Sequence, residues 1–285
     1  MPLLSTNDDF KIVSLPGLNS HLSMSTVRGE AYKAEGKNNQ DCVASFSAGE
    51  VTVDIVCDGL GGYADQNGEL AARLCCEEAE KIVEQGFEKM TPEEIPSYFL
   101  KKLLQQTTVR YAQENLGPQA GTTLLLMITI ASQITVYHLG DSRAMFFTPD
   151  GAFVLQTVDH KPAEFLHRFK LTRYVYKTDP KELTAQADEW KVDLKNYPQG
   201  LIAVLMSDGI TDNLKTSVDE PECTTALSEL IKIHRDAESL CATIMKQANE
   251  HMALKGTPEG EQLDVKPDNS ACLVRWFRKN LISQP

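Results

Sequence analysis

Four acidic residues stand next to apolar, strand-like runs that are widely separated in this chain. Two of the runs lead into Asp-Gly pairs, and a strand that ends at Asp-Gly presents a carboxylate at a sheet edge and then turns sharply, because glycine tolerates positive φ and close backbone approach. Such strand ends can converge into one cluster of oxygen ligands, the type that hard cations such as Mg²⁺ and Mn²⁺ prefer. The sequence therefore suggests a metal centre built from Asp58, Asp141, Asp208 and Asp268.

The strands that must position these residues are indicated by their hydrophobic patterning. Pro149-Asp150-Gly151 is a hairpin signal and joins two of them. Strands are predicted at 43–57 with a turn at Gly49-Glu50, at 123–131, 133–139, 143–148, 152–156 and 201–207, and at 270–277.

Helices are predicted in blocks between the strands. Residues 65–87 carry apolar side chains at helical spacing. A second helix is expected to run from Thr91, a plausible cap with Pro92 in the first turn, to about Leu116. A long amphipathic helix is expected within 221–253, followed by a flexible stretch at 256–260. Strands in runs with helices in long blocks favour antiparallel sheets with helices packed on them.

The composition excludes some function classes. The 285 residues are 42% hydrophobic and 24% charged, which is ordinary for a soluble globular protein. The net charge of −12 argues against a nucleic-acid binder, although bound metals could still attract a phosphate. No run reaches the roughly 18 apolar residues of a membrane helix, and the first residues lack a secretory signal. Seven irregularly spaced cysteines without a C-x-x-C motif indicate free thiols in a reducing compartment. We therefore expect a cytoplasmic protein, monomeric and without membrane or nucleic-acid partners.

Seven short motifs occur in an order and spacing that are specific together, although any one of them could arise by chance. On these motifs the chain resembles the metal-dependent serine/threonine protein phosphatases of the PPM, or type 2C, family. The resemblance implies an α+β fold, a sandwich of two antiparallel β-sheets flanked by helices, with the metal centre in the cleft between the sheets. The motifs are Asn39-Gln40-Asp41, Asp58-Gly59-Leu60-Gly61-Gly62, Gly121-Thr122-Thr123, Gly140-Asp141-Ser142-Arg143, Asp159-His160-Lys161-Pro162, Ser207-Asp208-Gly209 and Asp268-Asn269.

The resemblance implies two Mg²⁺ or Mn²⁺ ions, with a third in some members. Two ions that share one water can lower its pKa and aim it at phosphorus, so the protein needs no covalent nucleophile. The chain has no C-x5-R or G-x-S-x-G motif, which agrees with this chemistry. By position, Asp58 matches the ligand that bridges the two metals, Asp208 and Asp268 match ligands of the first metal, and the Gly59 carbonyl matches a ligand of the second. Asp141 matches a ligand of the third metal. Asp41 matches a residue that holds a metal-bound water, and Asn269 one that orients phosphate or water.

Simpler explanations exist for several of these residues. Asp58 and Asp208 could be turn formers, and Asp141 could be a structural partner of Arg143. The Gly121-Thr122-Thr123 motif is better explained as a strand entry with close packing than as a phosphate cradle. Two histidines are expected to be structural, His160 in its turn and His138 in the core. Cys57 should face away from Asp58, because neighbouring strand residues point to opposite faces.

Some positions depart from the family pattern. Gln40 replaces the usual glutamate, which could weaken the second metal, and Leu60 replaces a histidine that serves as the acid in some members, leaving a water or Tyr63. Gly36 stands where an arginine often grips the phosphate. The cations that could take over this role are Lys37, Arg28 and Lys33.

These observations predict metal-dependent hydrolysis of phosphoserine and phosphothreonine in proteins. Two alternatives are open: a catalytically weak or silent regulatory binding protein, and a phosphatase of small phosphorylated metabolites. Residues 1–22 are expected to form an N-terminal arm, either loose or paired as an edge strand, and 23–280 the phosphatase domain. A lid-like insertion is expected at about 160–200, where a long surface connection is the alternative.

Overall fold

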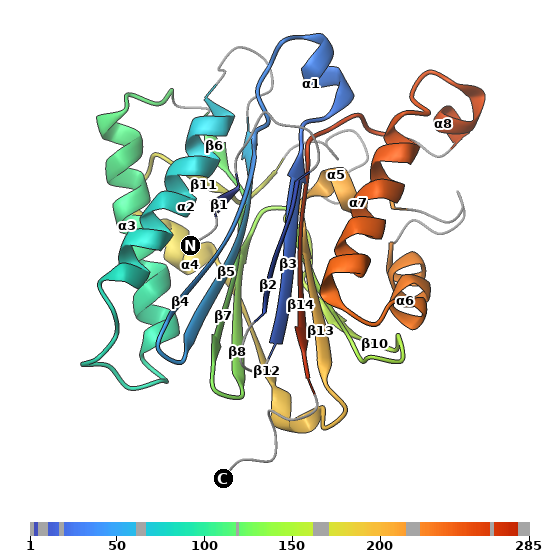
Figure 1. Ribbon diagram of the computed structural model, residues 1–285. Helices are drawn as coiled ribbons and strands as arrows, with labels where there is room; N and C mark the ends of the chain where they lie inside the picture. The colour runs from blue at the N-terminus through green and yellow to red at the C-terminus, as the bar shows by residue number, and fades with distance from the viewer. Residues whose placement is uncertain are drawn as a thin grey trace.

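Two antiparallel β-sheets pack face to face, and helices cover the outer face of each sheet (Figure 1). The predicted sandwich is thereby confirmed. The computed structural model describes residues 3–4, 11–16, 20–60, 67–117, 120–161, 171–214, 223–262 and 265–278.

The first sheet has the strand order β1-β4-β5-β7-β8-β12, and the short strands β6 and β11 extend it beside the end of β5. Tight turns join β4 to β5, as the sequence predicted, and β7 to β8, whereas α2 and α3 lie between β5 and β7 in the chain. The strands are β1 (Leu3–Leu4), β4 (Asp41–Ala48), β5 (Val51–Leu60), β6 (Gly121–Thr122), β7 (Leu124–Ile130), β8 (Gln133–Leu139), β11 (Val175–Tyr176) and β12 (Asp188–Asp193).

The second sheet has the order β10-β9-β13-β14-β3-β2, with every neighbouring pair antiparallel. The predicted hairpin at 149–151 joins β9 to β10, and Thr148 N–H donates to the Ala152 carbonyl at 2.9 Å. The strands are β2 (Lys11–Pro16), β3 (Ser20–Val27), β9 (Arg143–Phe147), β10 (Phe153–Gln156), β13 (Leu201–Met206) and β14 (Ser270–Phe277).

The outer faces carry different helices. On the first sheet α2 packs against β4 and β5, and α3 packs on α2 (Figure 1). On the second sheet α7 lies across β3 and β14, with α6 beside it. No helix of the described residues is long and apolar enough to cross a membrane. The helices are α1 (Glu30–Ala34), α2 (Gly68–Glu84), α3 (Ile95–Gln113), α4 (Pro180–Gln186), α5 (Asp208–Thr211), α6 (Thr224–Ile233), α7 (Ala237–Met252) and α8 (Pro258–Gln262), with a 3₁₀ turn at Leu194–Asn196.

Three predictions for the helices need adjustment. The helix α3 is regular from Ile95, one turn after Thr91, and Thr91 and Glu94 form a capping box in which Glu94 accepts the N–H of Thr91 at 3.0 Å. The single helix expected within 221–253 is two helices, since Asp236 accepts the Ser239 N–H at 2.7 Å and caps a new helix. The stretch expected to be flexible at 256–260 contributes to α8.

Two segments without a clear pattern contribute strands. Residues 11–16 form the edge strand β2, and the boundary predicted after residue 22 falls within β3. Within 160–200, β12 pairs with β8 and forms an edge of the first sheet, a strand that sequence patterning missed. Part of the expected lid, 162–170, lies outside the described residues, so the domain division and the lid stay predictions.

Strand alternation decides which side chains enter the layer between the sheets. Along β5, Val56 packs in the apolar layer between the sheets, whereas Ile55 and Cys57 pack in the layer under the helices. Because successive strand residues point to opposite faces, Asp54 and Asp58 share the inter-sheet face with Val56. One strand therefore delivers two carboxylates between the sheets.

The first of these carboxylates joins the two sheets. Asp54, which is 0% exposed, accepts hydrogen bonds at 2.5 and 2.6 Å from the guanidinium of Arg275 on β14. Ser45 donates to Asp54 at 2.6 Å, and Arg275 also donates to the hydroxyls of Ser45 and Ser20. Any alignment of the sheets that separated Asp54 from Arg275 would leave an unpaired charge in the interior. The buried pair with these hydrogen bonds therefore favours the observed alignment.

We expect Arg275→Met to lower the free energy of unfolding by about 3–5 kcal/mol, because Asp54 is left buried without a counter-charge. Urea unfolding would measure the loss. The double variant Asp54→Leu/Arg275→Met should recover much of it, because no charge is then left unpaired.

The matched control is Arg73→Ala, which breaks the surface pair with Glu77 on α2 and should cost only about 0.5 kcal/mol. Equal losses for Arg275→Met and Arg73→Ala would show that the buried pair is not a structural anchor.

Candidate metal centre

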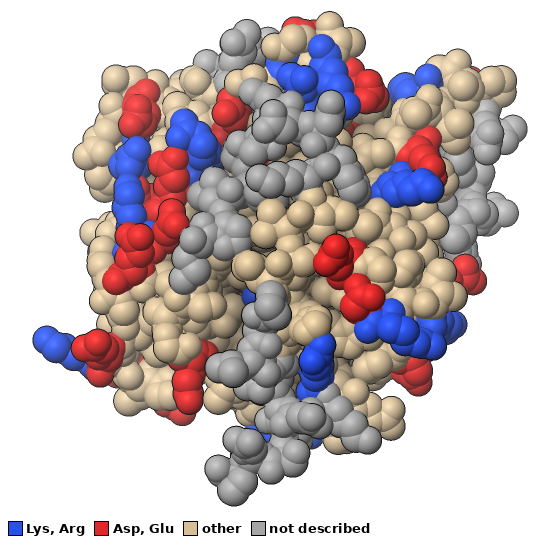
Figure 2. Space-filling model, viewed as in Figure 1, with Lys and Arg blue, Asp and Glu red and all other residues tan. Residues whose placement is uncertain are grey.

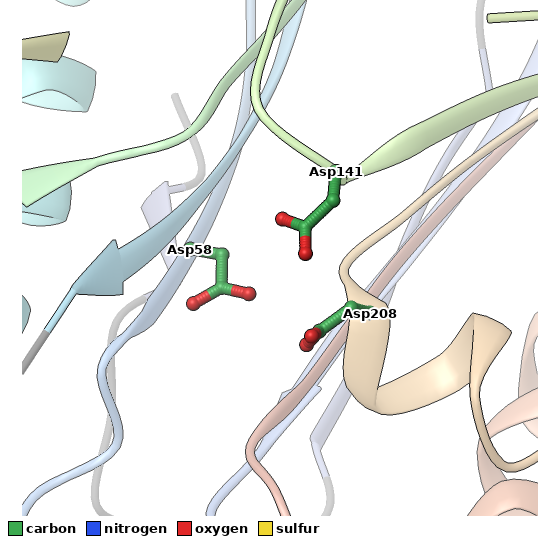
Figure 3. A group of neighbouring side chains, drawn as sticks. All are labelled: Asp58, Asp141 and Asp208. Carbon is green, nitrogen blue, oxygen red and sulfur yellow. The ribbon is translucent and has the colours of Figure 1, made fainter. Parts of the chain in front are cut away.

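Three carboxylates from distant parts of the chain meet between the sheets. Asp58 comes from β5, Asp141 from the turn between β8 and β9, and Asp208 from the start of α5; their side chains point toward one another (Figure 3). One oxygen of each lies within 4.8 Å of the others. The convergence predicted from the sequence is therefore present for these three residues.

The local geometry at the first Asp-Gly pair differs from the prediction. The strand β5 does not end at Asp58 but continues to Leu60 by pairing with β6. Asp41 lies directly opposite Asp58 on β4, which brings a fourth carboxylate to the same place. Ser207 donates to Asp41 at 2.7 Å, so Asp41 is held from the other sheet as well.

The glycines that follow Asp58 and Asp208 serve close packing rather than positive φ, which neither of them has. A Cβ on Gly59 would lie 2.1 Å from the Gly68 carbonyl oxygen, and one on Gly209 would lie 1.7 Å from the Asn269 carbonyl oxygen. Both contacts are with backbone, which cannot move aside. Glycine is therefore required for the segments that carry the carboxylates to approach one another.

The backbone of Asp58 is clamped by the Gly121-Thr122-Thr123 segment. Thr123 N–H and the Thr122 hydroxyl donate to the Asp58 carbonyl at 2.8 and 2.9 Å, and Asp58 N–H donates to the Thr123 hydroxyl at 2.9 Å. The segment is a strand entry, as predicted, and it fixes the position of the carboxylate on β5.

Asp268 and its neighbour link the loop after β3 to the centre. The Tyr32 hydroxyl donates to the Asp268 carboxylate. Asn269 is buried, and its side-chain oxygen accepts the Gly29 N–H at 3.1 Å. The side chain of Asn269 thus holds the backbone just before α1, the helix that carries Tyr32. Its predicted role toward phosphate or water stays a prediction.

The alternative in which Asp141 pairs with Arg143 is not found. Arg143, at the start of β9, binds Asp159, just beyond the end of the neighbouring strand β10, with two hydrogen bonds of 2.7 and 2.8 Å. Asp141 instead pairs with Lys161, whose ammonium is 2.7 Å from the carboxylate. His160 lies between these two pairs, with its Nδ1 accepting the Gly140 N–H at 3.0 Å.

The other side chains with expected structural roles are also in the interior. His160 Nε2 donates to the carboxylate of Asp188 on β12 at 3.0 Å, so both ring nitrogens are engaged in the fold. His138 is fully buried and stacks on His160 with centroids 4.7 Å apart, as expected for a core residue. Cys57 packs in the layer beneath α2, on the face of β5 opposite Asp58, as predicted.

The cations predicted to bind phosphate lie near the turn after β3, and two of them are in ion pairs. Lys33 pairs with Glu30 at 2.8 Å and Lys37 with Glu35 at 2.6 Å. Blue and red side chains accordingly lie side by side over α1 in Figure 2. Arg28 makes a long contact of 3.4 Å to the Lys37 carbonyl, and its Nε is buried without a hydrogen-bond partner. Tyr63 lies outside the described residues.

Burial and like charges perturb the carboxyl groups of the centre. Burial, and then the charge of Asp41 followed by that of Asp208, holds the pKa of Asp58 well above its ordinary value. Burial, then Asp141, raises the pKa of Asp208 in the same way. Burial raises the pKa of Asp41 to about 8, against the opposing hydrogen bond from Ser207. These carboxylates are therefore short of positive charge.

The donor set fits a divalent cation. Carboxylate oxygens that converge within 4.8 Å, and that have raised pKa values in the metal-free chain, form a site that a hard cation would stabilise. Asp58 and Asp208 could hold such an ion, with Asp141 beside them. Asp268 is close enough to act on the charge of Asp208.

Sequence reasoning missed several residues that position the centre. Ser207 and Lys161 belong to the motifs Ser207-Asp208-Gly209 and Asp159-His160-Lys161-Pro162, so the sequence contained a signal for both, although no role was predicted for either. Tyr32 lies in no motif and reaches Asp268 from α1, the short helix that follows β3.

Comparison with known proteins agrees with this geometry. The family model for protein phosphatase 2C matches residues 28–255, most of the chain. The chain belongs to the protein phosphatase 2C family. It is similar to a serine/threonine phosphatase of Listeria monocytogenes, with 27% identity over 234 residues that cover 76% of this chain and 82% of the relative.

Solved structures of the family share the fold. A serine/threonine phosphatase of S. agalactiae superposes with a TM-score of 0.70 at 18% identity, covering 91% of this chain and all of that one. The phosphatase Stp1 of Staphylococcus aureus superposes with a TM-score of 0.68 at 19% identity, covering 93% of this chain and 97% of that one. The sandwich of two antiparallel sheets is thus the fold that this chain shares with these structures.

The raised pKa values predict how pH acts on the metal-free protein. Between about pH 4 and 8 the folded chain binds more protons than the unfolded chain, because the carboxyl groups of Asp41 and Asp58 ionise later when folded. We therefore expect these groups to lower the free energy of unfolding as pH rises through this window. Thermal melts in EDTA across the window would measure the decrease.

Added Mn²⁺ should reverse this trend, because metal binding requires the deprotonated carboxylates and becomes stronger as pH rises. The control is Asp41→Asn/Asp58→Asn, whose melting temperature should depend less on pH in EDTA. Parallel pH profiles with and without Mn²⁺ would contradict the assignment of these carboxylates to a metal centre.

Proposed function

We propose that this chain hydrolyses phosphoserine and phosphothreonine in proteins, with divalent cations held by the carboxylates between the sheets. The family membership supports the reaction class, and the relatives that the chain resembles are serine/threonine phosphatases. The single observation that carries the proposal is the convergence of Asp58, Asp141 and Asp208 within 4.8 Å. The proposed ions are two Mg²⁺ or Mn²⁺.

The residues of the chain have distinct parts in this proposal. When bound, two divalent ions supply a water of lowered pKa and the positive charge that a phosphate dianion requires. Asp58 would contact both ions, with the Gly59 carbonyl as a further ligand, and Asp208 and Asp268 would hold one of them. Asp41, anchored by Ser207, would accept a proton from the water and orient it.

The fixed positions of these residues matter as much as their identities. The backbone of Asp58 is clamped by three hydrogen bonds, and Asp41 is held across the two sheets. A group held in this way loses little entropy when the reaction begins, so most of the contact energy can stabilise the transition state.

The cellular setting is also proposed. All seven cysteines are described, and each is buried with a free thiol, which suits a reducing compartment such as the cytoplasm. The expected substrate is a phosphorylated protein, and the expected oligomeric state is a monomer.

We expect Asp58→Asn to lower kcat by at least about 10³, because it removes the carboxylate that both ions would share. Hydrolysis of a phosphothreonine peptide and of a chromogenic phosphomonoester would be measured with Mn²⁺. EDTA should abolish the activity of the parent, and excess Mn²⁺ should restore it.

The matched control is Asp179→Asn, which removes the same charge at an exposed helix cap that asparagine can also provide. Full activity of Asp58→Asn, or of the parent in excess chelator, would contradict the proposal. A parent that binds Mn²⁺ but hydrolyses neither substrate would favour a catalytically silent regulatory protein. Faster hydrolysis of small phosphorylated metabolites than of the peptide would favour a metabolite phosphatase.

The environment of the nearby cations predicts which one binds the substrate phosphate. Arg28 adjoins Gly29, which packs on the Asp268 carbonyl, and its Nε lacks a partner, whereas Lys37 is already paired with Glu35. We expect Arg28→Ala to raise KM about five- to thirtyfold, equivalent to about 1–2 kcal/mol, and Lys37→Ala to change it little.

Steady-state kinetics at two salt concentrations would test the order of these effects. Rising salt should weaken substrate binding more in the parent than in Arg28→Ala, because screening acts on the charge that the variant lacks. A larger effect of Lys37→Ala than of Arg28→Ala would assign the phosphate contact to the lysine.

A further inference from the structure

A lysine ammonium lies inside the acidic cluster. Lys161 Nζ is 2.7 Å from Asp141 Oδ2, and its side chain is only 21% exposed. Asp208 and Asp212 also act on its charge, although Asp212 has a second cationic partner in Lys266. Lys161 therefore occupies a position that a cation would be expected to fill.

The turn that carries Lys161 is fixed at both preceding residues. Asp159 is held by two hydrogen bonds from Arg143, at 2.7 and 2.8 Å. His160 N–H donates to the Gly140 carbonyl at 2.7 Å, and Gly140 N–H donates to His160 Nδ1 at 3.0 Å. The turn 159–161 is thus docked on the turn that carries Asp141, so the ion pair is built into the backbone course rather than made by a free surface lysine.

The charges of the centre indicate what Lys161 does. Five carboxylates act on one another here, those of Asp58 and of its four acidic neighbours. Two divalent ions and one ammonium neutralise five carboxylates, whereas three divalent ions and the ammonium would leave an excess of two positive charges. Like charges within a few ångströms repel strongly where water is largely excluded.

We propose that Lys161 is the built-in counter-cation of Asp141, and that its ammonium occupies the place in which a third divalent ion would otherwise bind between Asp141 and Asp208. The inference rests on the proposed metal centre. The centre of this chain holds two ions, and Asp141 is a partner of Lys161 rather than a metal ligand. A third ion gains access only when the lysine leaves the carboxylate.

Calorimetric titration of the metal-free protein with Mn²⁺ tests this inference without a measurement of activity. The parent should bind two Mn²⁺. Lys161→Gln should bind a third, at least about tenfold more tightly than any further Mn²⁺ that binds the parent, because a unit positive charge has been removed beside the carboxylates. Lys161→Arg keeps the charge and should bind two.

Two comparisons keep the test decisive. Lys191→Gln removes the same charge from an exposed pair with Glu189 on β12, and should bind Mn²⁺ as the parent does. Lys161→Met serves as a second variant without the charge. The rise in melting temperature on adding Mn²⁺ should be larger for Lys161→Gln and Lys161→Met than for the parent.

Equal Mn²⁺ stoichiometry and affinity in the parent, Lys161→Gln and Lys161→Met would overturn the inference and leave the proposed function intact. Binding of three Mn²⁺ by the parent would also overturn it. A parent that binds no Mn²⁺ would overturn the proposed metal centre, and the inference with it.

Discussion

The crowding of like charges between the two sheets is the constraint on which this structure depends. Burial and mutual repulsion raise the pKa values of Asp58 and Asp208 well above the ordinary range. The fold supplies hydrogen-bond donors or a cation to the surrounding carboxylates, and in the proposed function a divalent ion would neutralise Asp58 and Asp208. The compensating contacts are Ser207 to Asp41, Tyr32 to Asp268, and Lys161 to Asp141.

The alternation of side chains along β5 places both a carboxylate of the centre and a carboxylate that joins the sheets in the layer between them. Asp54 and Asp58 lie on one face of β5, four residues apart, so both enter the layer between the sheets. Asp54 meets Arg275 there and fixes one sheet against the other. Since Asp58 belongs to the same rigid strand, the ion pair that aligns the sheets also sets where the carboxylate of the centre can stand.

The sequence predicted features that depend on local patterning and missed those that depend on the tertiary path. The central strands were predicted because both of their faces are apolar. The strand β12 was not predicted, because it lacks a continuous apolar run. It pairs with β8 at the edge of the sheet, and along it Val192 and Trp190 alternate with exposed Glu189 and Lys191. Asp58 and Asp208 were predicted from motifs that keep ligand and glycine adjacent.

The partners of those ligands could not be predicted in the same way. Arg143 is two residues from Asp141 and was the natural local candidate, yet Asp159 takes its guanidinium with two hydrogen bonds. That choice brings the following residues, His160 and Lys161, onto the turn of Asp141. The ion pair of Arg143 with Asp159 thus places Lys161, rather than Arg143, beside Asp141. A short sequence motif cannot predict this choice of partner, because it depends on a residue that is distant in the sequence.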